Sequence, residues 1–137
     1  MNTFTQTVDL LHRGMSASVV RREVIANNIA NAETENFKRT TVNFESELKR
    51  AIESGRQKPA LELTRTHDLH FNNHRVREIG EVQIRRVVDY ASISNNNGNN
   101  VDAEQEFMLA LQNQMHYMLL ADAANFEFSQ VSRVLRG

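Results

Sequence analysis

The sequence predicts a mainly α-helical protein in which long helices at the two ends of the chain pair as an antiparallel coiled coil. Apolar residues recur at helical spacing in residues 1–31 and 101–137, and neither stretch contains proline. The middle segment, residues 32–100, is polar and holds the chain's single proline and three of its five glycines. We therefore expect a core formed by the two terminal helices and an extended, irregular middle with one short helix and short β-strands.

The N-terminal helix is predicted to begin near Phe4, because Thr3 and Gln6 have the spacing of a capping box. Its apolar stripe is formed by Val8, Leu11, Met15, Val19, Ile25, Ala26 and Ile29. A helix of about 28 residues is roughly 42 Å long. A small compact domain cannot cover a helix of that length by itself.

The middle segment contains weaker signals. Asn43 can cap a short helix near residues 44–54, with Gly55 just past its end. Residues 61–64 and 81–85 alternate between apolar and polar side chains, so each of these two stretches is predicted as a strand.

The C-terminal helix follows an asparagine-rich turn at residues 95–100. Asp102 and Gln105 form a second capping box, and the helix is predicted to continue to about Arg136. Its near-heptad seam, which we expect to pack on the N-terminal helix, is formed by Met108, Leu111, Met115, Met118, Ala121, Ala124, Phe128, Val131 and Leu135.

The other face of the C-terminal helix is also poor in charge. Between Phe107 and Ser132 the only Asp, Glu, Lys or Arg residues are Asp122 and Glu127. Apolar side chains on the face away from the seam are Phe107, Leu119, Leu120 and Phe126. A helix that is apolar or amide-bearing all round is normally buried on several sides. Two helices cannot provide that burial in one monomer, so the sequence predicts self-assembly.

Three amides, those of Asn27, Asn28 and Asn31, lie at helical spacing near the end of the N-terminal helix. They offer hydrogen-bond donors and acceptors without charge, which suits a crowded surface where neighbouring backbones need partners. The alternative is a helix end that frays into an asparagine-rich turn. Spacing alone favours the second interpretation.

The same stretch carries a family resemblance. Asn27-Asn28-Ile29-Ala30-Asn31, Thr34 and Phe37-Lys38 resemble the pattern N-N-I-A-N-x-x-T-x-G-[FY]-K of the flagellar rod and hook axial proteins. Asn36 stands where the family usually has glycine, a mild change because asparagine is the next best residue for a left-handed turn. Glu35 replaces a frequent proline, so this turn is less rigidly preset.

A second stretch resembles the C-terminal pattern of one member of this family. It comprises residues 97–102, Glu104, Glu106 and residues 113–117. The resemblance implies a structural subunit of the bacterial flagellar basal-body rod. Such a subunit assembles with itself, other rod subunits and basal-body components into the tube that transmits torque. It also implies that the segment after Phe37 packs between neighbouring subunits. Passage through the flagellar export apparatus, without a cleaved signal peptide, would place the protein in the basal body, periplasmic in a two-membrane cell.

Composition argues against several other functions. With 16 basic and 17 acidic residues, the net charge of −1 gives no reason to expect nucleic acid or an anionic membrane as partner. No apolar run reaches membrane-spanning length, and there is no cysteine for thiolate chemistry. No phosphate-binding glycine loop or nucleophile motif indicates an enzyme or a small-molecule substrate. We therefore expect no enzymatic activity and no cofactor.

A metal site is the weaker alternative for the residues between Thr66 and Gly80. His67, Asp68, His70 and His74 could serve as ligands, but this stretch is polar and lacks an apolar frame, so we expect a solvated loop.

The main rival to a rod subunit is a small helical export chaperone or adaptor that binds a partner's amphipathic helix. The residues predicted to form the assembly interface are Val8, Leu11, Met15, Asn27, Asn28, Ile29, Asn31, Phe37, Phe107, Leu111, Met115, Met118, Phe128, Val131 and Leu135.

Overall fold

The computed structural model describes residues 3–56, 77–92 and 97–136. The elements in chain order are α1 (Thr3–Ala30), β1 (Thr40–Asn43), α2 (Glu45–Arg56), the 3-10 helix η1 (Ile79–Glu81), β2 (Arg85–Val88) and α3 (Ala103–Arg136). Residues 1–42 and 84–137 form one compact unit, and residues 43–83 form another. The prediction of a mainly α-helical chain with long terminal helices and a short middle helix is confirmed.

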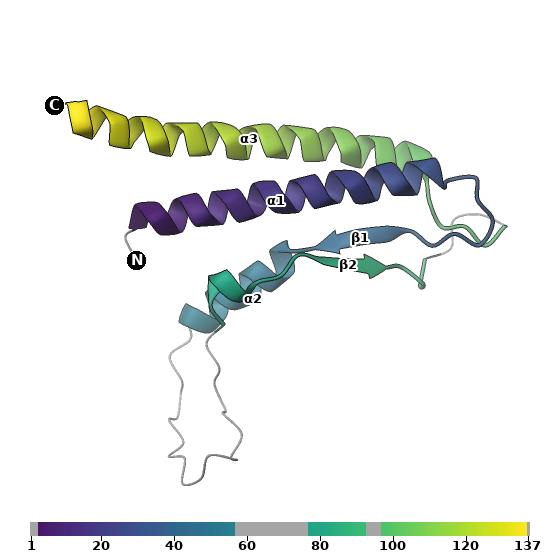
Figure 1. Ribbon diagram of the computed structural model, residues 1–137. Coiled ribbons are helices and arrows are strands. Elements are labelled where there is room, and N and C mark those ends of the chain that lie inside the picture. Colours follow the sequence, from purple (N-terminus) through teal and green to yellow (C-terminus); the bar gives the residue numbers. More distant parts are fainter. Residues whose placement is uncertain (1–2, 57–76, 93–96, 137) are drawn as a thin grey trace, which may run out of the picture. The chain divides into compact units, whose positions relative to one another are not determined.

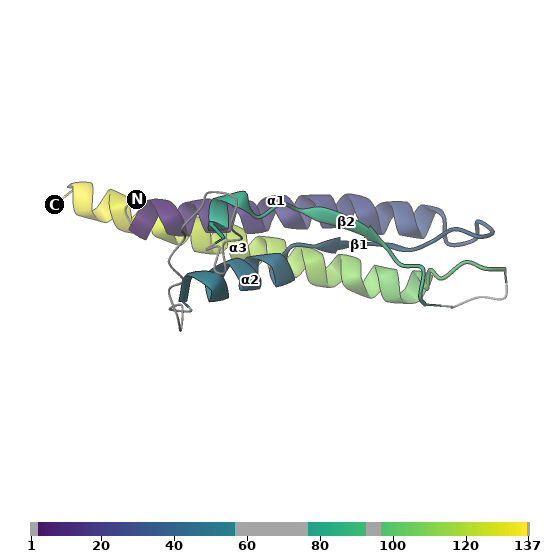
Figure 2. The ribbon, with the colours of Figure 1, turned by 90° about the horizontal axis from the view of Figure 1, so that it is seen from below.

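In the first unit, α1 and α3 lie side by side and run in opposite directions (Figures 1 and 2). The rings of Phe4 and Phe128 meet edge to face, with their centroids 5.9 Å apart. Farther along, a Cβ atom placed on Gly14 would lie 3.1 Å from Leu120 Cδ1, so the absence of a side chain at Gly14 allows the helices to approach closely. The predicted antiparallel pairing of the terminal helices is therefore confirmed.

The predicted seam of α3 meets α1 at Phe128, but its first half, from Met108 to Met118, is not the face that packs on α1. Most of its large side chains are exposed: Met108, Leu111, Met115, Met118, Phe128 and Leu135. The face toward α1 instead includes Glu106, Asn113 and Leu120, although Leu120 was expected on the opposite side. Asn113 Nδ2 donates a 2.8 Å hydrogen bond to the Ser18 carbonyl of α1.

The physical reason for this error lies in the partner surface. Ala17 and Ser18, which are both buried, and Gly14 give α1 a face of small residues. A polar residue of α3 finds a hydrogen-bond partner there, and Leu120 finds room. The apolar periodicity of α3 does not reveal which of its faces fits the small residues of α1.

The two strands pair as a small antiparallel sheet (Figure 1). The strand predicted at residues 81–85 overlaps β2 only at Arg85, because residues 79–81 form η1. Strand β1 was missed, since Asn43 was interpreted only as a helix cap. Short strands are defined by the partner with which they pair, and that pairing joins segments more than 40 residues apart. The strand predicted at residues 61–64 lies outside the described residues.

The predicted helix starts agree closely with the structure. Helix α1 includes Thr3 itself, and α2 begins one residue later than predicted. Gly55 lies inside α2 rather than beyond its end. At α3 the predicted cap is confirmed, because Asp102 Oδ1 accepts hydrogen bonds from the backbone N–H groups of Glu104 at 3.0 Å and Gln105 at 3.2 Å.

The second unit is tied together by a few polar contacts. Arg77 binds the Glu47 carboxylate of α2 at 3.1 Å, and its backbone N–H donates to Ser54 Oγ at 3.0 Å. At the start of α2, Asn43 Oδ1 accepts a hydrogen bond from Ser46 Oγ.

Candidate assembly interface

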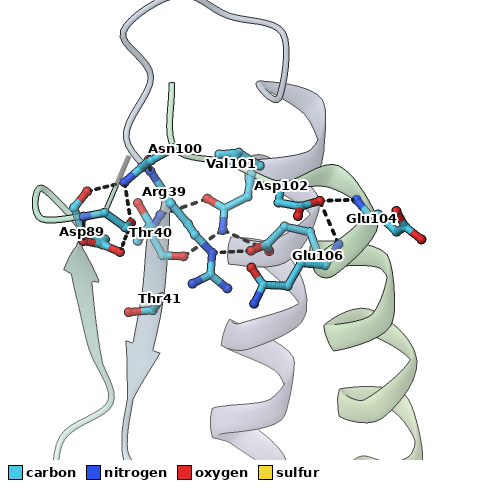
Figure 3. A network of polar contacts seen from close by, with 12 residues as sticks. Arg39, Thr40, Thr41, Asp89, Asn100, Val101, Asp102, Glu104 and Glu106 are labelled. Atoms are coloured by element: carbon cyan, nitrogen blue, oxygen red, sulfur yellow. Dashed lines mark hydrogen bonds and ion pairs between the residues drawn. The ribbon is translucent and has the colours of Figure 1, made fainter. Parts of the chain in front are cut away.

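A network of side chains closes one end of the α1–α3 hairpin, and Figure 3 shows its contacts. We call it the clasp, and its members are Asn28, Arg39, Thr40, Asn99, Asn100 and Glu106. Asn28 Nδ2 donates to the Thr40 carbonyl at 2.8 Å, while Asn28 Oδ1 accepts from the Thr40 N–H at 3.0 Å. This pair of bonds imitates a backbone ladder and holds the segment after α1 against the helix.

At the centre of the clasp, Glu106 is completely buried, with 0% exposure. Arg39 Nε lies 2.5 Å from Glu106 Oε1 (Figure 3). Asn28 Nδ2 donates to Glu106 Oε2 at 3.1 Å. A buried carboxylate is tolerated only when it is paired and hydrogen-bonded. Arg39 and Asn28 meet that requirement, so the charge of Glu106 fixes the segment after α1 to the first turns of α3.

Asn99 completes the end of α1. Its Nδ2 donates to the carbonyls of Asn31 at 2.9 Å, Ala32 at 2.9 Å and Thr34 at 2.8 Å. Carbonyl groups at and just beyond a helix C-terminus have no partner within the helix. Asn99 therefore acts as a cap supplied by a distant part of the chain, and it is fully buried.

Its neighbour Asn100 joins three segments. Asn100 Oδ1 accepts from the Arg39 N–H at 2.6 Å, and Asn100 Nδ2 donates to the Asp89 carbonyl at 2.7 Å. Asp89 N–H in turn donates to the Arg39 carbonyl at 2.8 Å. The β1 and β2 segments are thus tied to the residues just before α3.

Two left-handed residues bring the loops of the clasp together. Asn36 has φ 57°, which confirms that asparagine adopts here the turn for which the family pattern has glycine. Gly98 has φ 78°, and a Cβ atom there would lie 2.6 Å from Asn36 Oδ1. The Asn36 N–H donates to the Asn97 carbonyl at 3.1 Å, so glycine at position 98 is required by both conformation and space.

The pKa of Asp89 is shifted by its hydrogen bonds. The hydroxyl of Ser92 donates to its carboxylate at 2.5 Å, and the N–H groups of Ser92 and Ala91 donate to Oδ1 at 3.1 and 2.9 Å. These bonds, that of the Ser92 hydroxyl first, hold the pKa of Asp89 below its ordinary value of 3.8.

The side of α3 away from α1 carries an apolar surface, which we call the outer stripe. Its residues are 53–67% exposed, and they are Phe107, Met108, Leu111, Met115, Met118, Leu119 and Phe126. At 100° per residue they fall within one broad face of the helix, and the only acidic or basic residue among them is Asp122. A contiguous apolar surface on a chain of this size marks an interaction site.

The predicted interface residues fall into distinct places. Phe107, Leu111, Met115 and Met118 come together in the outer stripe. The half-buried ones are Val8, Leu11, Met15, Ile29, Asn31, Phe37 and Val131. Asn27 is exposed, Phe128 contacts Phe4, and Leu135 lies exposed in the last turn of α3.

Asn28 departs from the expectation, because its amide is buried and bonded within its own chain. The asparagine-rich turn does follow α1, but Asn28 belongs to the clasp rather than to an exposed surface. The roles of Arg39 and Glu106 were missed as well, since their contact spans 67 residues of sequence. The joint presence of the two sequence patterns could have indicated the contact of Asn28 with Glu106, because each pattern contains one of the two, but Arg39 lies just beyond the first pattern.

The chain is thus a helical hairpin with a buried polar clasp at one end and an uncovered apolar face along one helix, and such a face is typical of a protein that works through contact with other chains. A family model described as flagella basal body rod protein matches residues 11–38.

Relatives in three organisms are similar over nearly the whole chain. The flagellar basal body rod protein FlgB of Borreliella burgdorferi is 39% identical, over 99% of this chain and 100% of its own length. FlgB of Borrelia hermsii is 42% identical, again over 99% and 100%. FlgB of Bacillus subtilis is 31% identical, over 100% of this chain and 98% of its own. The chain therefore belongs to the FlgB family of flagellar basal body rod proteins.

This membership makes the chain a structural subunit of the flagellar basal-body rod, and the export chaperone or adaptor is not favoured. None of the helices in the described residues is long and apolar enough to cross a membrane. Within residues 3–56, 77–92 and 97–136, no three His, Cys, Asp or Glu side chains are grouped to hold a metal. His67, Asp68, His70 and His74, the suggested ligands, lie outside those ranges.

Proposed function

We propose that the outer stripe of α3 is the surface through which this chain assembles with itself and with other rod subunits. The observation that carries the proposal is the exposure of seven large apolar side chains on one face of a single helix. In a monomer these side chains remain in water, whereas contact with a neighbouring helix removes them from it. Assembly is thus driven by the surface that the hairpin leaves uncovered.

The magnitudes favour contact with more than one neighbour. Full burial of a Leu, Phe or Met side chain stabilises an association by about 1.5–3 kcal/mol. Since the stripe residues are already partly shielded, covering the whole stripe contributes about 10 kcal/mol. Association itself costs about 4–15 kcal/mol in lost freedom of motion. A single contact is therefore marginal, and repeated contacts in a polymer give the stiffness that torque transmission requires.

The proposal also covers four predicted interface residues of α1. The half-buried Val8, Leu11 and Met15 of α1, together with the exposed Asn27, are proposed to contact neighbouring subunits. In this arrangement residues 1–31 and 101–137 form the assembling core, and residues 32–100 lie in the extended middle. The proposed role involves no catalysis, cofactor, nucleic acid or small-molecule substrate. Delivery is proposed to use the flagellar export apparatus without signal-peptide cleavage, which places the subunit in the periplasm of a two-membrane cell.

The substitution Leu111→Asp tests the proposal. Leu111 lies within the outer stripe and is 58% exposed, so a carboxylate there is tolerated in the monomer but not in an apolar contact. The matched control is His116→Asp, which adds the same group to an exposed position of α3 outside the stripe. We expect Leu111→Asp to abolish motility and recovery of the subunit in isolated basal bodies, while the control retains both.

Circular dichroism of the purified variants separates assembly from folding. Both variants are expected to keep the helical signal of the parent chain. Phe128→Asp, on the predicted interface as well, is a less clean test because Phe128 also contacts Phe4 within the hairpin. Basal bodies that contain the Leu111→Asp subunit at normal amounts would contradict the proposal.

A further inference from the structure

A hollow of about 610 Å³ lies where α1 ends and α3 begins. Ile29, Ala32 and Val101 contribute to its apolar wall, and Glu33 and Asp102 contribute carboxylates. Its volume is within the range of about 300–1,000 Å³ that is typical of binding pockets. The hollow therefore has room for side chains and a negative rim.

The opposite end of the same hairpin displays complementary chemistry. Because Phe128 pairs with Phe4 near the start of α1, the last eight residues of α3 continue beyond α1 by roughly 12 Å (Figures 1 and 2). Val134 and Leu135 are 82% and 80% exposed, and Arg133 and Arg136 flank them. We call residues 133–136 the α3 tip.

The geometry points to an end-to-end contact in which the α3 tip of one copy of this chain enters the hollow of another, an inference that rests on the proposed function. Val134 and Leu135 supply apolar side chains for the wall formed by the half-buried Ile29 and Ala32. Arg133 and Arg136 meet the carboxylates of Glu33 and Asp102.

The contact joins two different surfaces, so it does not close on itself as a two-fold dimer does. Each added copy presents a new hollow at one end and a new tip at the other. Heterologous contacts of this kind generate rings or open helical polymers. The outer stripe and the α3 tip would then serve different contacts, sideways and end to end.

Cysteine cross-linking tests this contact in the full-length chain, which has no cysteine of its own. The variant Ala32→Cys/Val134→Cys places one thiol in the hollow and one on the tip. Within one molecule these thiols are separated by more than the length of α1, roughly 50 Å, so a short bismaleimide joins them only between molecules. The control variant His116→Cys/Val134→Cys keeps the tip thiol and moves its partner about 20 Å along α3.

We expect the hollow variant to form a covalent ladder of dimers and larger species, with at least ten times the yield of the control. Adding Glu33→Arg to it should lower the yield several-fold, and adding Arg136→Glu as well should restore much of it. Equal yields from the two cysteine variants, or a ladder only from the control, would overturn the inference.

Sedimentation of the same samples separates this inference from the proposed function. Assemblies that sediment but give no tip-to-hollow ladder would overturn the end-to-end contact and leave the outer stripe as the assembly surface. Samples that neither sediment nor cross-link at any concentration would count against both.

Discussion

Replacing Arg39 with methionine tests whether the clasp stabilises the hairpin. Methionine keeps most of the volume of the arginine stem but removes the guanidinium 2.5 Å from Glu106. The carboxylate then stays buried, hydrogen-bonded to the Asn28 amide but without the arginine's charge. Removing one member of a buried ion pair costs about 3–5 kcal/mol. Because the Arg39 side chain is 19% exposed and water can approach, we expect the lower end, about 3 kcal/mol.

The double variant Arg39→Met/Glu106→Gln isolates the cost of the uncompensated charge. It removes the carboxylate as well, so only lost hydrogen bonds remain, and the expected destabilisation falls to about 1–2 kcal/mol. The double variant should therefore lose less free energy of unfolding than Arg39→Met alone. A double-mutant cycle measures this coupling between Arg39 and Glu106. The assay is urea unfolding followed by far-ultraviolet circular dichroism.

The control is Arg85→Met, the same change at an exposed position of β2. We expect it to alter the free energy of unfolding by less than about 0.5 kcal/mol. If Arg39→Met were equally mild, or if the double variant were no more stable than Arg39→Met alone, the account of Glu106 as a buried charge held by Arg39 would be refuted.

Two further predictions concern the loops of the clasp. Gly98→Ala should lower the free energy of unfolding by about 1–3 kcal/mol in the same urea assay, because alanine is strained at φ 78° and its Cβ would meet Asn36 Oδ1. Gly55→Ala in α2, where no atom lies within 4 Å of an added Cβ, is the control and should not destabilise. Asp89→Asn should reduce the loss of stability between pH 5 and pH 3. The ionised Asp89 carboxylate stabilises the fold above its ordinary pKa of 3.8, and this contribution is lost as the pH falls through the lowered pKa of the folded state. An identical acid profile for Asp89→Asn and the parent would disprove this role.

The sequence by itself determined the features that depend on neighbouring residues. The helix at each end follows from apolar spacing and the absence of proline, and the start of α3 follows from Asp102 acting on backbone groups two and three residues away. The left-handed turn at Asn36 was expected from the family pattern, which has glycine at this position, and asparagine tolerates that conformation. Such features require no knowledge of the rest of the fold.

Only the tertiary structure decided which face of α3 packs on α1. The apolar pattern of Leu111, Met115 and Met118 is the stronger signal in the sequence, yet the small residues of α1 pair with the face of Asn113 and Leu120. A helix with apolar residues on several faces has several ways to pack, and the complementary surface selects one of them. The face that is not selected remains as the outer stripe.

The clasp and the strands were likewise beyond local inference. Glu106 looks like an ordinary acid in the first turn of a helix, a position that the helix dipole favours. Its burial depends on Arg39 and Asn28, which lie 67 and 78 residues away. Hydrogen bonds over such separations form only when the folded chain brings the two segments together. The sequence could not reveal them because their stabilising energy depends on both segments, and neither segment carries a sign of it alone.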